Sequence, residues 1–245
     1  MAPLAPRPDF PINFPSKLEG FTKPAASFIR DHKLHNLAGI ACAAVVFDDH
    51  NRMLLLQRAS HDSQPGTWES PGGGVDPEDP SLLHASAREL WEEAGLVGTH
   101  IMRAVPVHEH GANSALPELT TKLFPEGDAD WVYQNVASYF TNRSGSKILC
   151  ALAFQFADVK RDTKITLDPN EHQNYKWVTE IEMLSERMSD GFEIPIAGRN
   201  MKDMLQQAFK IRRESGEMRI IRLWNKNANI SRTNTPLSHS TMIVT

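Results

Sequence analysis

The sequence predicts an α/β (α+β) fold in which a mixed β-sheet is combined with a few helices. Short apolar segments such as Gly39–Phe47 are separated by turn-forming residues, which favours strands. Ser81–Ala94 carries apolar residues at helical spacing, and Ala197–Glu214 does so again as a C-terminal helix. Strands and helices that occur in this mixed order are typical of α/β and α+β domains.

The first half of the chain predicts an arm followed by two strands. Residues 1–24 are rich in proline and predict an extended, mobile arm. Gly39–Phe47 and Arg52–Arg58 are expected to be strands, and the turn-forming residues between them predict a hairpin. The next segment is rich in glycine and proline and predicts a loop that leads into the helix at Ser81–Ala94. Gly95 stands where a C-terminal cap belongs.

The second half predicts three strands and the final helix. The strands are expected at Asn135–Phe140, Lys147–Val159 and Tyr175–Val178, and a turn joins the first two as a hairpin. The last helix has one apolar stripe, which predicts a packing surface, made of Met201, Met204, Leu205 and Phe209. We therefore expect an arm over residues 1–24, one domain with its C-terminal helix over 25–215, and a tail over 216–245.

Composition narrows the class of protein. The net charge of −4 argues against a partner that is a nucleic-acid polymer, although a metal ion could still attract a small anion. Cys42 and Cys150 lie in apolar segments, which favours buried reduced thiols and a cytoplasmic location. The N-terminus has no signal-peptide pattern, and the longest apolar segment is too short to cross a membrane.

Three carboxylates cluster on the helix at Ser81–Ala94. Glu89, Glu92 and Glu93 stand at positions i, i+3 and i+4, so they share one stripe. The opposite stripe is apolar and consists of Leu83, Ala87, Leu90 and Ala94. In a partly desolvated cleft each like-charge pair costs roughly 2–3 kcal/mol, and a divalent cation would remove that repulsion. A solvated acidic face remains the alternative.

A glycine loop precedes this helix. Pro71–Gly74 allows close backbone approach and positive φ, and it offers backbone groups to a phosphate or a metal ion. A simple turn is the alternative for such a loop. Asp79 is expected as the N-cap, with Pro80 at the first helical position. The loop and the acidic stripe should therefore be neighbours in space.

The residues from Gly74 to Leu96 resemble the Nudix box, Gly-x5-Glu-x7-Arg-Glu-φ-x-Glu-Glu-x-Gly-φ, in which φ is aliphatic. Everything from Arg88 to Leu96 matches, and Gly74 has the right spacing. One position departs, because Pro80 stands where the box has its first glutamate. In the family that glutamate supports the loop and the arginine, and Asp79 is the candidate replacement, as a cap or as a partner of Arg88.

The resemblance implies an α-β-α sandwich and a Mg²⁺-dependent hydrolase, with Mn²⁺ as a possible substitute. Its substrate would be a nucleoside diphosphate linked to another group X, or a related small-molecule diphosphate. The metal ligands it implies are Glu89, Glu92, Glu93 and the Gly74 carbonyl. Arg88 would orient Glu89, which would complete the metal shell or accept the proton of the water. The family also allows a homodimer.

Two further roles are expected, that of a general base and that of substrate contact. The general base of some members is a distant glutamate, for which Glu171 and Glu109 are candidates, although an exposed loop residue is the alternative for each. Gly73, Trp68 and Arg58 are expected to contact substrate, and Trp68 would either stack on a base or anchor the loop.

The X group is left open by the box itself. Loops and the insertion near residues 112–130 would select it, and ADP-ribose-like or dinucleotide substrates rank slightly higher from family frequency alone. Because of Pro80, a binding module that senses a nucleotide or ADP-ribose without turnover is the second hypothesis.

Overall fold

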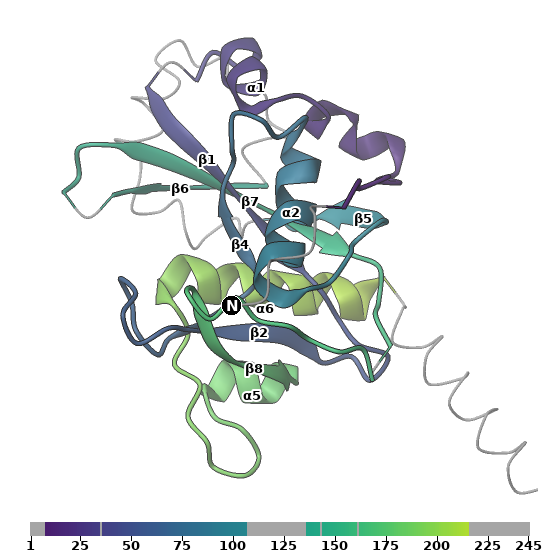
Figure 1. The fold of residues 1–245 in the computed structure, drawn as a ribbon, viewed down its shortest axis with the longest axis vertical. Coiled ribbons are helices and arrows are strands. Elements are labelled where there is room, and N and C mark those ends of the chain that lie inside the picture. The colour runs from purple at the N-terminus through teal and green to yellow at the C-terminus, as the bar shows by residue number, and fades with distance from the viewer. Residues whose placement is uncertain (1–7, 35, 107–135, 143, 161, 216–245) are drawn as a thin grey trace, which may run out of the picture.

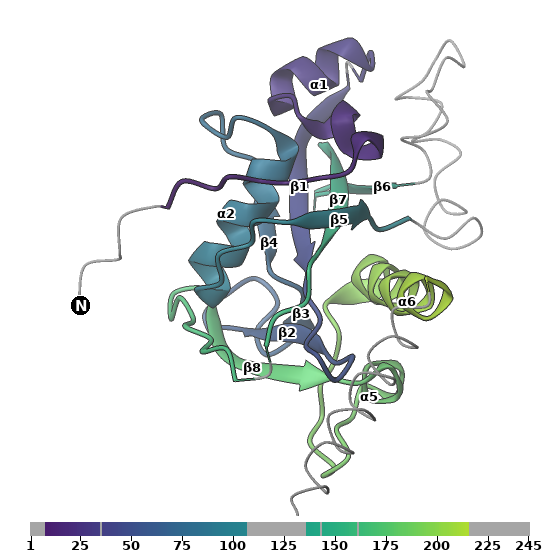
Figure 2. The ribbon, with the colours of Figure 1, turned by 90° about the vertical axis from the view of Figure 1, so that its right-hand side faces the viewer.

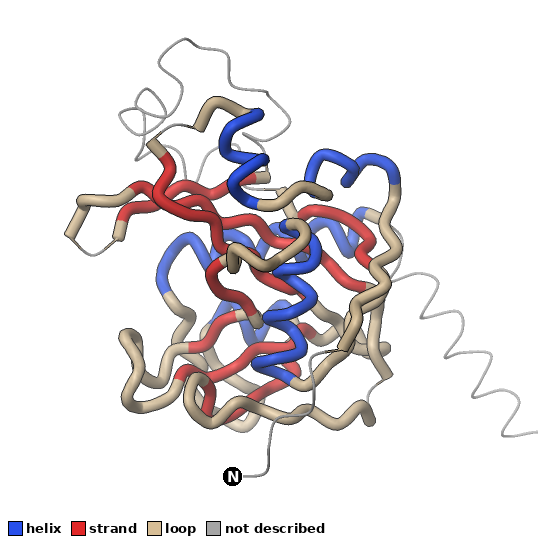
Figure 3. The backbone as a smooth tube through the Cα atoms, turned by 45° about the horizontal axis from the view of Figure 1, so that its top comes forward, coloured by secondary structure: helices blue, strands red, loops and turns tan. Residues whose placement is uncertain are grey.

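The computed structural model describes residues 8–34, 36–106, 136–142, 144–160 and 162–215. The strands are β1 (Leu37–Val45), β2 (Met53–Arg58), β3 (Trp68–Glu69), β4 (Gly72–Gly74), β5 (Ile101–Ala104), β6 (Ala137–Thr141), β7 (Ile148–Phe156) and β8 (His172–Val178). The helices are η1 (Ser16–Phe21), α1 (Ala25–Asp31), α2 (Leu82–Ala94), α5 (Glu180–Ser185) and α6 (Gly198–Glu214). Helices lie against both groups of strands (Figure 3), and α6 packs against residues of both groups.

The strands form a mixed sheet and a smaller antiparallel one (Figure 1). In the first, the order is β4-β1-β7-β5, and β6 also pairs with β7. β1 and β7 are parallel, while the other pairs in this sheet are antiparallel. The second sheet has the order β3-β2-β8. This arrangement confirms the predicted α/β (α+β) class with a mixed sheet and a C-terminal helix.

β1 contributes side chains to two apolar cores, one on each face of the sheet. Successive side chains of a strand point to opposite faces of the sheet. Ile40, Cys42 and Ala44 therefore join the core that contains α2, whereas Val45 joins the core that contains α6. Figure 2 shows α2 and α6 on opposite sides of β1 and β7. The glycine strand β4 pairs with β1 beside α2, and this pairing positions the candidate site.

The segment from residue 8 to residue 24 differs from the expectation of an extended arm. Phe10, Leu18 and Phe21 are buried in the core beneath α2, and Phe21 packs edge-on against Phe154 with ring centroids 5.3 Å apart. The backbone of Asn13 also forms hydrogen bonds with Thr99 and Ile101, at the start of β5. Its prolines exclude regular strands but not burial. The division of the chain at residues 24 and 215 stays a prediction.

The predicted hairpin between β1 and β2 forms only at its tip. Phe47 pairs with Met53, and Asn51 takes the left-handed conformation with φ of 60°. Beyond this bridge the two strands separate, because β1 pairs with β7 while β2 pairs with β8. The second predicted hairpin is confirmed, since β6 and β7 pair antiparallel from Thr141 opposite Ile148.

The C-terminal helix follows its predicted stripe. α6 buries Leu205 and Phe209 completely or nearly so, while Met201 and Met204 are partly buried at its N-terminal end. The short strand predicted at Tyr175–Val178 is longer than expected, because β8 begins at His172. Among the described helices, none is both long enough and apolar enough to cross a bilayer.

Candidate active site

The glycine loop lies against both β1 and α2. Gly72 pairs with Ala43, and a Cβ atom on Gly72 would lie 2.7 Å from the Ala43 Cα atom. A Cβ atom on Gly73 would lie 2.8 Å from Oε1 of Glu89. Real Cβ atoms do not approach backbone atoms so closely, so Gly72 needs glycine, whereas a side chain at Gly73 would displace the Glu89 carboxylate. Of the two freedoms that the glycine loop allows, these glycines use close approach and not positive φ.

The start of α2 corrects one prediction and supports another. Ser81, not Asp79, is the N-cap, since its side chain accepts a hydrogen bond from the backbone of His84. Asp79 is buried and instead binds Arg88 through both carboxylate oxygens, at 3.0–3.2 Å. Pro80 therefore leaves the arginine with a carboxylate partner, one residue earlier than the box glutamate. Gly95 ends the helix as predicted, with φ of 69°.

Arg88 connects the loop to the helix from a buried position. Besides Asp79, it donates to the Gly74 carbonyl at 2.7 Å and to Glu92 at 2.8 Å, and it lies 2.8 Å from Glu89. Burial acts to lower the pKa of Arg88, but the hydrogen bonds to Asp79 and the neighbouring carboxylates raise it overall. The guanidinium thus stays charged. The Gly74 carbonyl, expected as a metal ligand, keeps one lone pair beyond this bond.

Glu89 and Glu93 are buried carboxylates, whereas Glu92 is partly exposed at 39%. Glu93 accepts a hydrogen bond of 2.8 Å from the Gly72 amide. Burial raises the pKa of Glu89 to about 7, against the opposing charge of Arg88. Burial also raises the pKa of Glu93 well above its usual range, and the charge of Glu89 adds to this effect. Negative charge in this place is costly without a cation.

Glu171 reaches this cluster from the loop before β8, far from α2 in the sequence. Its exposed carboxylate is near enough to raise the pKa of Glu93 further. Oxygen atoms of Glu93 and Glu171 and a ring nitrogen of His172 all lie within 4.8 Å of one another. Two ionised carboxylates this close repel each other, and a proton or a cation between them would remove the repulsion. The structure therefore brings Glu89, Glu93 and Glu171 together, while Glu109 lies outside the described residues.

Without metal, we expect the protein to become less stable as the pH rises. The pKa of Glu89 is about 7 in the folded chain against an ordinary value of 4.5. The folded state then binds more protons than the unfolded state between these values, so stability is full below about pH 4.5 and is lost as the pH rises through about 7. At about 1.4 kcal/mol per pKa unit, the loss is roughly 3 kcal/mol.

This expectation is checked by urea unfolding in chelator at about pH 5 and about pH 8. Glu89→Gln should show a flatter profile than the wild-type chain, because it removes the group that titrates. Identical pH profiles for the two proteins would contradict the assignment. Adding Mg²⁺ should stabilise the wild-type chain most at the higher pH.

Trp68 does not present a face to a ligand. Its side chain is fully buried and packs edge-on against Phe192, and its backbone bonds to Pro195 and Ala197, just before α6. Of the two roles considered for it, anchoring the loop agrees with this position, whereas stacking on a base does not. Arg58 is partly buried and binds Asp62 and Glu69 at 2.6 Å each.

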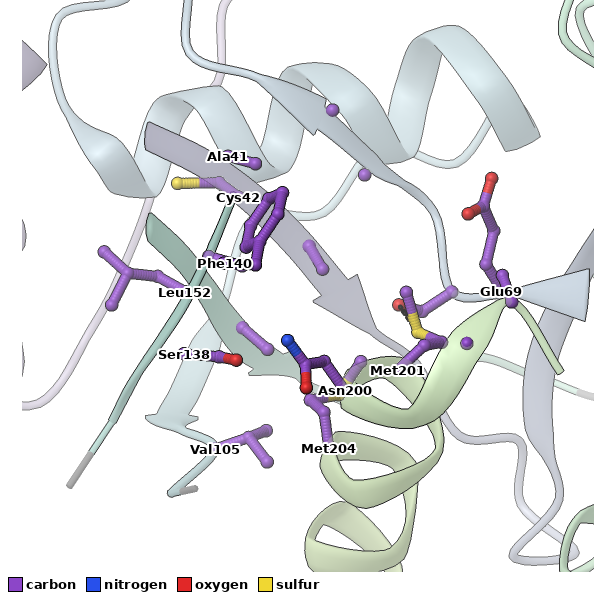
Figure 4. Close-up of a pocket in the computed structure, with 18 of the residues that line it drawn as sticks. Ala41, Cys42, Glu69, Val105, Ser138, Phe140, Leu152, Asn200, Met201 and Met204 are labelled. Atoms are coloured by element: carbon purple, nitrogen blue, oxygen red, sulfur yellow. Dashed lines mark hydrogen bonds between the residues drawn. The ribbon is translucent and has the colours of Figure 1, made fainter. Parts of the chain in front are cut away.

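A cavity of about 590 Å³ adjoins the glycine loop (Figure 4). It is lined by β1, β6 and β7, by Gly72 and Gly73, and by the first turn of α6. Most of its wall is apolar, with Phe140, Met201 and Met204 among the lining residues. Ser138 also lines it; the hydroxyl is buried and has no hydrogen-bond partner among the described residues. The cavity can thus take a flat or apolar group that carries a hydrogen-bonding atom.

The arrangement of loop, arginine and carboxylates agrees with a comparison with known families. A family model described as NUDIX domain matches residues 38–194, well over half of the chain. The chain belongs to the Nudix family. Within this Nudix domain lie all the residues of the site: the glycine loop, the acidic helix α2, and Glu171.

Individual relatives match over shorter stretches. The chain is 42% identical over 65 residues to the 8-oxo-dGTP diphosphatase of Proteus vulgaris, which covers 26% of this chain and 52% of the relative. It is 40% identical over 60 residues to the CTP pyrophosphohydrolase of Escherichia coli, covering 24% and 44%. The chain thus spans about half the length of these curated relatives. Among solved structures, the MutT protein from Methanosarcina mazei Go1 is similar, with 22% identity, coverage of 71% and 94%, and a TM-score of 0.48.

Proposed function

We propose that this Nudix protein is a Mg²⁺-dependent hydrolase that cleaves the diphosphate linkage of a nucleoside diphosphate joined to another group X. The observation that carries the proposal is the contact between the side chains of Glu93 and Glu171 beside Glu89. Glu93 is buried and Glu171 is exposed, and these carboxylates from two distant segments would repel each other if neither a proton nor a cation lay between them. The names of the matched relatives, a diphosphatase and a pyrophosphohydrolase, support the same reaction class.

The donor set fits a divalent ion. Carboxylate oxygens are the ligands that Mg²⁺ and Mn²⁺ prefer, and Glu89, Glu93 and Glu171 supply them. When bound, the ion would neutralise phosphate charge and lower the pKa of a water molecule. Glu92 is less well placed than expected for this purpose, because it is partly exposed and already paired with Arg88.

Side chains of the protein would position the ligands, accept a proton and hold the substrate. Arg88 holds Glu89 and the Gly74 carbonyl in place, so it acts as a positioning residue. Glu171 lies close enough to Glu93 to accept the proton of an attacking water molecule beside it. The cavity beyond Gly72 and Gly73 would hold the X group or the base, and the diphosphate would lie nearer the acidic side chains.

The binding-module hypothesis loses its main motivation in this structure. It rested on Pro80, which removes the box glutamate that supports the arginine. Asp79 binds Arg88 through both oxygens and accepts a further hydrogen bond of 2.9 Å from Asp76 in the same loop. The support is therefore present in another form, and turnover remains the function that the site favours.

A panel of diphosphates tests the proposal. Purified protein is incubated with nucleotide sugars, ADP-ribose, dinucleotides and nucleoside triphosphates, and products are read by mass spectrometry in water enriched in heavy oxygen. We expect cleavage of at least one class with Mg²⁺ or Mn²⁺, and loss of activity in chelator that added metal restores. Tight binding of a nucleotide without turnover in any divalent ion would instead establish the binding module.

A further inference from the structure

His172 lies beside the carboxylate cluster although no role was expected for it. It is the first residue of β8, directly after Glu171, and only 2% of it is exposed. One of its ring nitrogens lies within 4.8 Å of carboxylate oxygens of both Glu93 and Glu171. A buried imidazole thus adjoins the place where the proposed function puts a divalent ion.

The two ring nitrogens have different surroundings. Nε2 is 3.4 Å from Oε1 of Glu69, which also accepts a hydrogen bond of 2.6 Å from Arg58. Nδ1 is buried, and no described residue gives it a hydrogen-bond partner. A buried polar atom without a partner costs free energy. With the proton on Nε2 facing Glu69, the lone pair of Nδ1 is left for a ligand.

This pattern is the one that metal-binding histidines show. An imidazole that ligates a metal through one nitrogen commonly donates its other N–H to a carboxylate, which fixes the ring orientation and the tautomer. Glu69 occupies that position for His172, and Arg58 in turn holds Glu69. The contacts therefore account for both nitrogens if Nδ1 faces a cation.

We propose that His172 is a nitrogen ligand of the divalent-metal centre formed with Glu93 and Glu171, and that Glu69 orients its ring. The inference rests on the proposed function, because it places its ion at the same site. An imidazole suits Mn²⁺ and Co²⁺ better than Mg²⁺, which takes oxygen ligands. The centre should therefore bind Mn²⁺ and Co²⁺ with an advantage over Mg²⁺ that depends on His172.

Pulsed electron paramagnetic resonance of the Mn²⁺-loaded protein tests the ligand directly. We expect nitrogen modulation of the Mn²⁺ signal in the wild-type chain, with a frequency that changes when only the histidines carry the heavy nitrogen isotope. This measurement needs no variant. Mn²⁺ that binds without nitrogen modulation, or with modulation that histidine labelling does not change, would overturn the inference and leave the proposed hydrolase intact.

Two variants then assign the nitrogen to one residue. His172→Gln should abolish the modulation and reduce the ratio of Mn²⁺ to Mg²⁺ affinity about tenfold in calorimetry. The matched control is His61→Gln, because His61 is exposed and contacts the Asn170 carbonyl only two residues from His172; it should keep the signal. Modulation that survives His172→Gln refutes the assignment. Failure of the wild-type chain to bind Mn²⁺ would refute both this inference and the proposed metal-dependent function.

Discussion

Replacing Glu93 by glutamine should lower kcat about a thousandfold with the fold retained. A metal centre stabilises the transition state by several kcal/mol, and each loss of about 1.4 kcal/mol slows a reaction tenfold. Glutamine removes the negative charge, yet its carbonyl oxygen can still accept the hydrogen bond that the Gly72 amide donates to Glu93. The measurement is kcat and KM at saturating Mg²⁺, on a substrate found in the diphosphate panel.

A matched control distinguishes the loss of a site carboxylate from the loss of any negative charge. Glu193→Gln removes a carboxylate that is 72% exposed and paired with Arg187, so it should leave kcat unchanged. Glu93→Gln with wild-type kcat would show that Glu93 holds no catalytic ion. Thermal unfolding of both variants in chelator verifies that any loss of activity is not a loss of fold.

Asp79→Ala should destabilise the protein by about 3–5 kcal/mol, because it leaves the buried charge of Arg88 without its main partner. Asp79 has no exposed side-chain surface, and both its carboxylate oxygens accept hydrogen bonds from Arg88. Arg88 would retain Glu89 and Glu92, but the anchor between the loop and the start of α2 would be lost. Urea unfolding at neutral pH measures the change in the free energy of unfolding.

Asp76→Ala is the control for this prediction. Asp76 belongs to the same loop but is 57% exposed, and its carboxylate lies 3.7 Å from Arg88. An exposed pair of this kind contributes about 0–1 kcal/mol. Equal losses for the two variants would mean that Asp79 does not replace the support that the box glutamate provides elsewhere in the family.

Local spacing explains why much of the site could be predicted. Glu89 and Glu93 share one helical face, and helix geometry alone determines that relation. The pairing of Asp79 with Arg88 was one of two open roles, and only the position of Ser81 decides between them, because Ser81 takes the cap. Positions within one turn or one loop need no knowledge of distant segments.

The parts that could not be predicted depend on contacts between distant segments. His172 lies outside the strand predicted at Tyr175–Val178, and only the pairing of β8 with β2 brings it to Glu69 and Glu93. Trp68 carries no local sign that its ring would be completely covered by Phe192 and its neighbours. The prolines near the N-terminus predicted an extended arm, although Phe10 and Phe21 are buried in the core. Their burial could not be predicted because these apolar positions follow no regular period.

The glycine strand has a consequence for how substrates would be told apart. Gly72 and Gly73 line the cavity, and the same residues contact Glu93 and Glu89. The main chain of these two glycines therefore lies between the cavity and the acidic side chains. Because main-chain atoms set the distance between the cavity and the acidic side chains, the scissile bond of any ligand would lie at a constant distance from the cavity. Differences among ligands would be accommodated by the side chains that line the cavity, which can change without altering the acidic residues.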